Sequence, residues 1–404
     1  MAVGFDSGDL RPQHFSPKQL KQWLDDIRAH WRNHDWLASN SDNVYRAIRE
    51  CYLTNGGFPQ EGTRALLDIS RFMLTRVDYQ RWWKLYFEAV LMANKLRDYA
   101  LLHEINVHFG QAYLLKGDVA RARHLFATII SESDDSWQMA EQALLAYIGL
   151  IKVETWDYSD RFNEAAIKTA LELANRLGDR LLTDLLYQAL AGAYAHRQHS
   201  ERAVGYALTS LGYSFARGDY LQAVMTGIVL ASAYRKAGLF DQAQQALVFV
   251  HRLAKRVDHP QATALAAYEQ GVVEYYRGDY DSSEKWVLRA HNAFEALQWK
   301  RQLTMTVHML GNIALEMAHY ETAETRLETA LKAWRELDHV YEQASVLYDL
   351  GEVNRRWGRR DLALSYLDQS AAVCDEIPPM PSREWLISLI DDCRAKLVDT
   401  PDNV

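Results

Sequence analysis

The sequence contains little proline and little cysteine, and each shortage excludes a class of structure. Only 8 prolines occur in 404 residues, so few positions interrupt a helix. The three cysteines, Cys51, Cys374 and Cys393, are too few and too scattered to form a disulfide framework or a zinc site. Because this pattern is typical of a reducing compartment, we expect a cytoplasmic protein.

The sequence also lacks long apolar runs and an excess of positive charge. No window holds the roughly 18 consecutive apolar residues of a membrane-spanning helix. Residues 1–11 lack the apolar core of a signal peptide. The net charge of −8 is opposite in sign to the basic surface of a typical nucleic-acid-binding protein. We therefore expect neither a membrane nor a nucleic acid as a partner.

Catalytic motifs are missing as well. The chain has no phosphate-binding Walker A loop, no G-x-G-x-x-G, no G-x-S-x-G and no H-E-x-x-H. The 14 histidines are scattered, and no further ligand is indicated beside the closely spaced ones. We expect no catalytic residues, no metal site and no cofactor, and we do not predict enzyme activity.

What the sequence does contain is a repeat of 40 residues. Five copies follow one another without a slip from Leu181, and stacking them aligns three columns of similar residues. The first column is small and consists of Ala191, Ala231, Gly271, Gly311 and Gly351. The second, twelve residues later, is also small and consists of Ala203, Ala243, Ser283, Ala323 and Ala363. The third is mostly apolar and consists of Ala207, Leu247, Val287, Leu327 and Leu367. A fixed period in this range indicates an array of helical repeats.

The two small columns predict where the helices of a pair cross. Two helices approach closely only where side chains are nearly absent, which explains the glycine, alanine and serine in these columns. Between the columns, Gly238, Gly278 and Gly358 predict a turn, because glycine readily adopts the left-handed conformation that ends a helix. Two looser copies precede the five regular ones. We therefore predict seven helix pairs between about Leu101 and Ile377.

These offsets resemble those of the tetratricopeptide repeat. A small residue is followed three positions later by an aromatic one, as with Tyr113, Tyr194 and Tyr234, and then by the turn and the second small residue. The period of 40 residues is longer than that family's usual one and is similar to the repeats of bacterial maltose-activator-type and Rap-type regulators. The resemblance implies an all-α fold. We expect a right-handed α-α superhelix of about seven to eight helical hairpins, with capping helices at both ends.

By its pattern the chain divides into four segments. Residues 1–15 are predicted to be disordered, residues 16–97 helical, residues 101–377 the repeat array, and residues 382–397 a C-terminal capping helix. Residues 16–97 allow two interpretations. They form an N-terminal cap, because terminal repeats are normally atypical, or an effector module, since Rap-type regulators carry a small helical bundle before their repeats.

The resemblance also implies which residues face inward, because the first helix of each pair lines the concave face of a tetratricopeptide array. Counting from the first small column gives a set of candidate ligand-binding residues that is rich in aromatic and cationic side chains. The set is Gln188, Met225, Ile228, Arg235, Tyr268, Tyr275, Tyr276, His308, Asn312, Tyr348 and Arg355. A clamp of lysine, asparagine and arginine, which grips a C-terminal carboxylate in one subgroup of the family, is matched here by Asn312 alone.

An aromatic, methionine-bearing groove with spaced cations suits a peptide or helix that has apolar anchors and some acidic residues. In the alternative interpretation, apolar side chains such as Met225 pack between adjacent pairs and the groove is closed. Another protein or a peptide is therefore the expected partner. The sequence determines neither its identity nor the oligomeric state.

Two functions fit this pattern. The first is a non-catalytic scaffold that binds a protein or peptide through its concave face. The second is a ligand- or peptide-responsive bacterial regulator, in which a bound ligand changes the superhelix and the N-terminal helices act on a partner protein. Residues 1–100 distinguish the two, because a helical bundle separate from the array would favour the regulator.

Overall fold

The structure is a computed structural model, and its described residues are helical throughout, without a β-strand. It describes residues 15–31, 34–53, 58–70, 79–133, 139–156, 164–197, 199–257 and 259–398. Helices follow one another in pairs along the chain, as the repeat predicts, so the expected all-α fold is confirmed. The predicted disordered segment, residues 1–15, lies outside the described residues except for Phe15.

Contacts divide the chain into two units, residues 1–108 and residues 109–404. The first unit contains α1 (Pro17–His30), α2 (His34–Ser39), α3 (Ser41–Leu53), α4 (Pro59–Asp68), α6 (Tyr79–Leu96) and the first part of α7 (Tyr99–Lys116). The division falls inside α7 and tests none of the segment boundaries given above, which stay predictions.

The first helix shows why the sequence begins to fold where it does. The Ser16 side chain accepts a hydrogen bond from the backbone N–H of Gln19, and the Gln19 side chain accepts one from the backbone N–H of Ser16. This capping box satisfies two backbone donors that have no partner inside the helix. The apolar stripe of Leu20, Leu24 and Ile27 is then buried, and α1 packs against α3 and α4.

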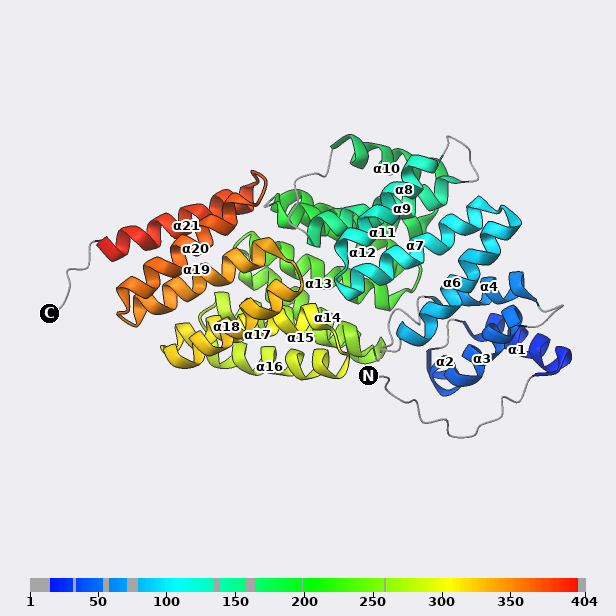
Figure 1. Cartoon of the computed structure of the whole chain (residues 1–404), viewed down its shortest axis with the longest axis horizontal. Helices are drawn as coiled ribbons and strands as arrows, with labels where there is room; N and C mark the ends of the chain where they lie inside the picture. The colour runs from blue at the N-terminus through cyan, green and yellow to red at the C-terminus, as the bar shows by residue number, and fades with distance from the viewer. Residues whose placement is uncertain are drawn as a thin grey trace, which may run out of the picture. The chain divides into compact units, whose positions relative to one another are not determined.

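The second unit is the repeat array (Figure 1). Its helices after α7 are α8 (Val119–Glu132), α9 (Ala140–Trp156), α10 (Glu164–Leu177), α11 (Arg180–His196), α12 (Ser200–Ala216), α13 (Tyr220–Lys236), α14 (Phe240–Val257), α15 (Pro260–Tyr276), α16 (Tyr280–Ala296), α17 (Lys300–Glu316), α18 (Tyr320–Glu336), α19 (Val340–Arg356), α20 (Arg360–Asp375) and α21 (Pro381–Val398). From α7 to α20 these form seven consecutive pairs, in agreement with the predicted number.

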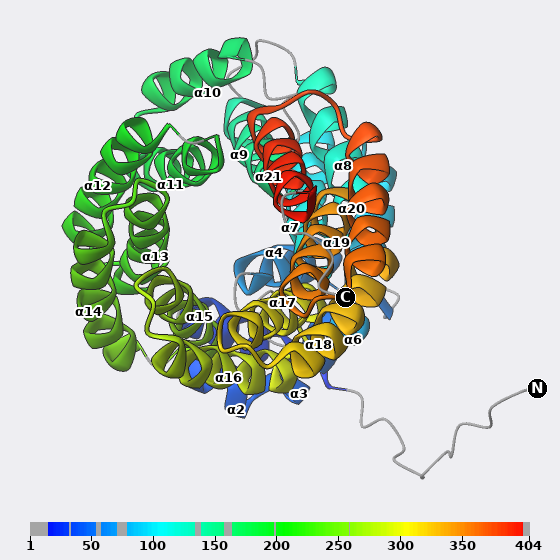
Figure 2. The same ribbon diagram turned by 90° about the vertical axis from the view of Figure 1, so that its left-hand side faces the viewer.

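Within this unit the two helices of a pair take different places. Figure 2 shows α11, α13, α15, α17 and α19 along the inside of a curve, with α12, α14, α16, α18 and α20 outside them. The curve closes on itself to a full turn, because a side chain added at Gly117 would lie 3.7 Å from Cδ2 of Leu337. The inner helices therefore line the concave face of a superhelix.

The small columns are the crossing points that the sequence predicts. A Cβ atom at Gly271 would lie 2.5 Å from Cγ2 of Val287, and one at Gly311 would lie 2.8 Å from Cδ2 of Leu327. Real Cβ atoms do not approach other atoms that closely. The apolar side chains of the third column therefore fit against the first column only because the residues there are small. The turns follow the prediction too, since Gly278 has a φ of 81°.

The last helix, α21, covers the end of the array. It packs against α19 and α20, and Leu386, Ile390 and Cys393 are buried there. This placement keeps the apolar face of the final pair out of water, as a terminal cap must. Among the helices that the structure describes, we find none whose length and apolar character suit it to cross a membrane.

Candidate binding surface

The concave face of the second unit gathers charged and aromatic side chains from four inner helices. They come from the last turn of α13, from the second half of α15, from the middle and end of α17, and from the whole length of α19. Segments far apart in sequence approach each other here. The charges of Glu269 and Glu342 both act on the pKa of Lys236, although Lys236 ends α13 and Glu342 lies in the first turn of α19.

A first cluster joins α13 to α15. Nε of Arg235 donates to Oε1 of Glu269 at 2.7 Å, and both side chains are largely buried. The Arg235 guanidinium also lies 5.5 Å from the centroid of the Tyr276 ring, a distance typical of a cation–π contact. Burial opposes the charge of Arg235, but Glu269 outweighs it and raises the pKa of the guanidinium.

A second cluster joins α17 to α19 around a buried histidine. Nε2 of His308 lies 2.6 Å from Oδ2 of Asp349, and Nδ1 lies 3.7 Å from Oε2 of Glu342. Burial disfavours the imidazolium, but the hydrogen bond to Asp349 and the charge of Glu342 prevail and raise the pKa of His308 to about 9. Burial likewise opposes the charge of Glu342, yet the neighbouring His308 lowers the pKa of that carboxyl to about 2. His308 and Glu342 are therefore both charged at neutral pH.

A third cluster lies further along α19. The carboxylate of Glu352 accepts hydrogen bonds from Arg355 at 2.6 and 2.8 Å and from Arg356 at 2.7 Å. Arg356 in turn donates two hydrogen bonds of 3.1 Å to Glu316, which ends α17. The thiol of Cys393 in α21 donates to Glu352 at 3.2 Å. Through this cluster the capping helix is connected to the concave face.

Aromatic side chains lie among these ions. The rings of Tyr275 and Tyr276 are 5.5 Å apart and nearly perpendicular. Their surroundings differ, because Tyr276 is 54% exposed whereas Tyr275 packs against buried Val272 and Met309. Tyr268 contacts the same apolar cluster, and burial followed by the charge of Glu342 raises its pKa. Of these three tyrosines, Tyr276 therefore has the most exposed ring.

The structure brings together part of the predicted set. Arg235, Tyr268, Tyr275, Tyr276 and His308 lie around the first two clusters, and Arg355 belongs to the third. Charge from Glu352 and Asp349 raises the pKa of Tyr348 after the larger effect of burial, which places that residue beside the third cluster as well.

The remaining predicted residues are less closely connected. Met225 and Ile228 are partly buried and pack against the core between α13 and α14, as the alternative interpretation expects for such residues. Gln188 is partly buried in α11. Asn312 is partly exposed, and its buried Oδ1 accepts no hydrogen bond. The assignment of all these residues to a binding site stays a prediction.

Our reading of the sequence missed the acidic partners of the concave face: Glu269, Glu342 and Asp349. Glu269 and Asp349 occupy one column of the repeat, two residues before the small column, where the other copies have Ala189, Val229 and Met309. A carboxylate in an otherwise apolar column was the available signal. The inward positions that the resemblance implies lie at other offsets, so this column is not among them.

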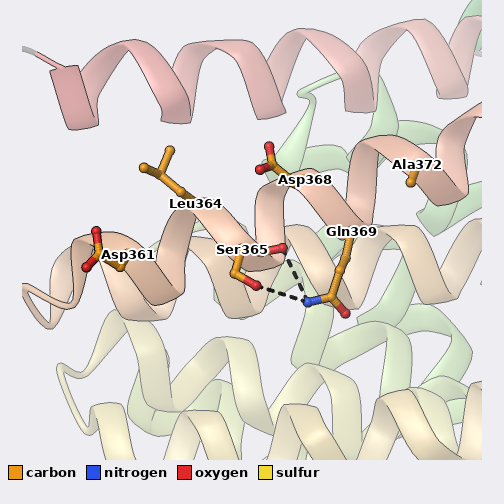
Figure 3. A pocket seen from close by; sticks show the side chains of 6 residues that line it. All are labelled: Asp361, Leu364, Ser365, Asp368, Gln369 and Ala372. Atoms are coloured by element: carbon orange, nitrogen blue, oxygen red, sulfur yellow. Dashed lines mark hydrogen bonds between the residues drawn. The ribbon is translucent and has the colours of Figure 1, made fainter.

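Other surfaces offer less. A shallow hollow on the outer helix α20 is lined by Asp361, Leu364, Ser365, Asp368, Gln369 and Ala372 (Figure 3). Gln369 donates to both the carbonyl and the hydroxyl of Ser365, so part of the lining is engaged with itself. Within the described part of the chain, no three histidine, cysteine or acidic side chains converge on a metal position.

Fold and concave face together define a helical-repeat protein with an ion-paired, tyrosine-bearing inner surface. Residues 302–376 match the family model of the tetratricopeptide repeat. Tetratricopeptide repeats therefore occur in this part of the chain, and the fold of the chain is similar to that of solved Rap-type regulators. No curated protein is significantly similar to it in sequence.

Three solved structures illustrate the similarity of fold. A Rap protein complexed with competence and sporulation factor has a TM-score of 0.58 at 16% identity, with 84% of this chain and 99% of that chain covered. NprR in complex with its cognate peptide NprX has a TM-score of 0.52 at 15% identity, with 82% and 99% covered. Aspartyl phosphate phosphatase F from Bacillus subtilis has a TM-score of 0.53 at 11% identity, with 89% and 94% covered. At these identities the likeness concerns the fold alone.

Proposed function

We propose that this chain is a non-catalytic scaffold that holds a peptide along the concave face of its second unit. The observation that carries the proposal is the placement of Arg235 and exposed Tyr276 together on that face, next to the His308 cluster. Core packing alone does not require an exposed tyrosine stacked with a cation. One protein of similar fold, NprR, is described in complex with its cognate peptide, which supports the same choice.

The chemistry of the face suggests what the peptide contains. An apolar or aromatic side chain of the peptide packs against the exposed part of the Tyr276 ring, which is 54% exposed although Arg235 and Phe240 lie against it. A peptide carboxylate competes with Glu269 for the Arg235 guanidinium, whose planar fork suits carboxylates. We therefore propose a peptide with an apolar anchor and at least one acidic residue.

Selection from a random peptide library on the full-length chain tests this proposal. We expect the selected peptides to share an apolar residue near an acidic one. Tyr276→Ala should weaken their binding at least about tenfold, as loss of a buried aromatic anchor typically does. Tyr220→Ala is the matched control, because Tyr220 is 39% exposed but its ring meets Phe215 edge-on and lies under the Arg256 guanidinium, both on outer helices. Equal binding by both variants would refute the concave site.

Tyr275→Ala separates packing from binding. Tyr275 packs against the cluster of Val272 and Met309, so its removal should lower the free energy of unfolding. Deleting a fully buried aromatic ring usually costs about 3–5 kcal/mol, and the partial exposure of Tyr275 should make its cost smaller. Tyr276→Ala should change stability far less. Urea denaturation of both variants measures the difference, and equal losses would mean that both tyrosines belong to the core.

A second function, a peptide-responsive regulator, is favoured by the division of the chain at residue 108. A separate first unit allows a peptide in the second unit to act on a partner protein through the N-terminal helices. Capturing partners from the native organism with the full chain, with and without a selected peptide, tests this. A regulator should exchange a partner when the peptide is added, and truncation of the first unit should abolish that response. An unchanged set of partners favours the simple scaffold.

A further inference from the structure

The outer helix α12 differs from the other outer helices of the array in its lack of charge. Between Arg202 and Arg217 it contains no acidic, basic or histidine residue. At the position of Leu208, later copies of the repeat have Val248, Leu288, Glu328 and Asp368. The exposed faces of α18 and α20 are charged accordingly, as Figure 3 shows for Asp361 and Asp368. Exposure to solvent does not explain why an outer helix lacks charged side chains.

Large apolar side chains stand out from this face. Leu208 is 50% exposed, Phe215 is 43% exposed, and Phe249 of the neighbouring α14 is 39% exposed. The rings of Phe215 and Phe249 lie 5.7 Å apart, so the patch is continuous across two helices. Between the large residues, Gly205 and Gly212 leave open space above the helix. Contiguous exposed apolar surface of this kind marks an interaction site.

Hollows border α12 on both sides. One, of about 870 Å³, lies between α10 and α12 and is lined by Tyr187, Tyr194, Tyr206, Gly205 and Thr209 among others. The other lies between α12 and α14 and includes Leu211, Leu230 and Phe249. A ridge between two grooves is the shape that accepts another helix, because side chains of one helix fit the grooves beside the other.

Charge around the patch indicates what the occupant is. Glu201 and Glu164 lie at the start of α12 and α10, whereas exposed Arg252, Lys255 and Arg256 lie at the far end of α14. At the acidic end Arg202 is paired with Glu164 at 3.6 Å and Lys168 with Glu172 at 3.8 Å, so the acidic character of this end rests on Glu201. If a second α12 runs antiparallel to the first, the acidic end of each copy meets the basic end of the other. Such an arrangement is self-complementary and closes with two-fold symmetry.

We propose that this face binds a second copy of the chain, with α12 packed antiparallel against its counterpart. Each α12 lies beside the hollow between α10 and α12 of the other copy, and Gly205, Thr209 and Gly212 allow the two helices to approach closely. The contact buries Leu208 and Phe215 of both copies. It lies on the outer face, so it is independent of the concave site and of the proposed function.

Sedimentation of the full-length chain over a concentration series tests the proposal. We expect a dimer whose dissociation constant rises at least tenfold in Leu208→Glu, because the variant places a charge in an apolar contact. Leu288→Glu is the matched control, since Leu288 occupies the same column and is 40% exposed, but has Lys285 and Arg289 beside it. The control should dimerise like the unaltered chain. Thermal melting confirms that both variants are folded.

Cysteine cross-linking locates the contact. Thr209 lies on the proposed two-fold side of α12, so Thr209→Cys should form a disulfide-linked dimer under mild oxidation. Thr329→Cys is its control, because Thr329 is an exposed threonine at the same repeat position of α18, and each hydroxyl donates at 2.9 Å to a carbonyl four residues earlier. The three native cysteines are buried. A monomer at all concentrations, a dimer indifferent to Leu208→Glu, or equal cross-linking of both variants overturns the proposal.

Discussion

Gly311 shows how a single position controls the packing of a repeat. Its backbone approaches Leu327 so closely that an added Cβ would lie 2.8 Å from the Leu327 side chain. Gly192, one residue beyond the same column in α11, has no atom within 4 Å of its Cβ position. The two glycines have the same backbone freedom and the same helical setting. They differ in which atoms lie near the position of an added Cβ atom.

Gly311→Leu should therefore destabilise the protein, and Gly192→Leu should not. Overpacking of a close crossing costs about 1–3 kcal/mol, whereas replacing an open helical glycine generally stabilises by a few tenths to about 1 kcal/mol. Midpoints of urea denaturation compare the two variants with the unaltered chain. Equal midpoints for both variants would show that the helices do not cross at Gly311.

His308 makes a second prediction at the same scale. Its pKa is raised from 6.5 to about 9 in the folded chain, so the stabilisation by its charge is fully present below pH 6.5 and is lost as the pH rises through 9. The melting temperature should therefore fall between these two pH values. His308→Gln should remove this part of the pH dependence. An identical pH profile in the variant would contradict the ion pairing of His308 with Asp349.

The individual helices have different roles. The inner helices hold the three clusters of ion-paired side chains, because their exposed residues face the concave side. The outer helices carry mostly solvated charges, with α12 as the exception. The capping helix α21 has a mainly structural place, since its buried residues continue the core of the last pair, and Cys393 also contacts the third charged cluster.

Deleting residues 381–404 should lower stability strongly. Leu386, Ile390 and Leu397 are buried in the native fold, and each fully buried apolar side chain contributes about 1.5–3 kcal/mol. The shortened protein should melt earlier and aggregate, because the last pair then exposes its apolar face. Deletion of residues 399–404 is the control and should change little. Equal melting temperatures for both deletions would show that α21 is not a cap.

For the second unit as a whole, stability accumulates along the array. Each pair packs mainly on its neighbours, so the central pairs are supported on both sides and the terminal ones on one. The ion pairs between inner helices, such as Arg235 with Glu269 and His308 with Asp349, add connections between neighbouring pairs. An array of this kind opens from its ends rather than all at once.

Hydrogen exchange measured by mass spectrometry should show this gradient. We expect the slowest exchange in α13, α14, α15 and α16, and faster exchange in α8 and α21, because terminal helices lose fewer contacts when they open. A bound peptide should slow exchange chiefly at the ends of α13 and α15. Uniform protection across the array would contradict stepwise opening.

Much of the fold follows from local pattern. The period of 40 residues, the small column with Gly311 and the turn glycines such as Gly278 predict seven stacked pairs, because close crossings and left-handed turns each tolerate few residue types. The signal is repeated five times in the chain, which makes it strong. The candidate site is less well predicted, since inward-facing positions are free to vary between copies.

The sequence alone determined the hairpins, their number and the side of each inner helix that holds Arg235, Tyr276 and His308. Only the tertiary structure decided which charges meet, because the curvature of the superhelix brings Glu342 of α19 close to Lys236 of α13. It also separated exposed Tyr276 from partly buried Tyr275, two neighbours that the pattern treats alike. Side-chain periodicity within a helix is a local property, whereas the distance between residues a hundred positions apart depends on how every intervening pair is stacked.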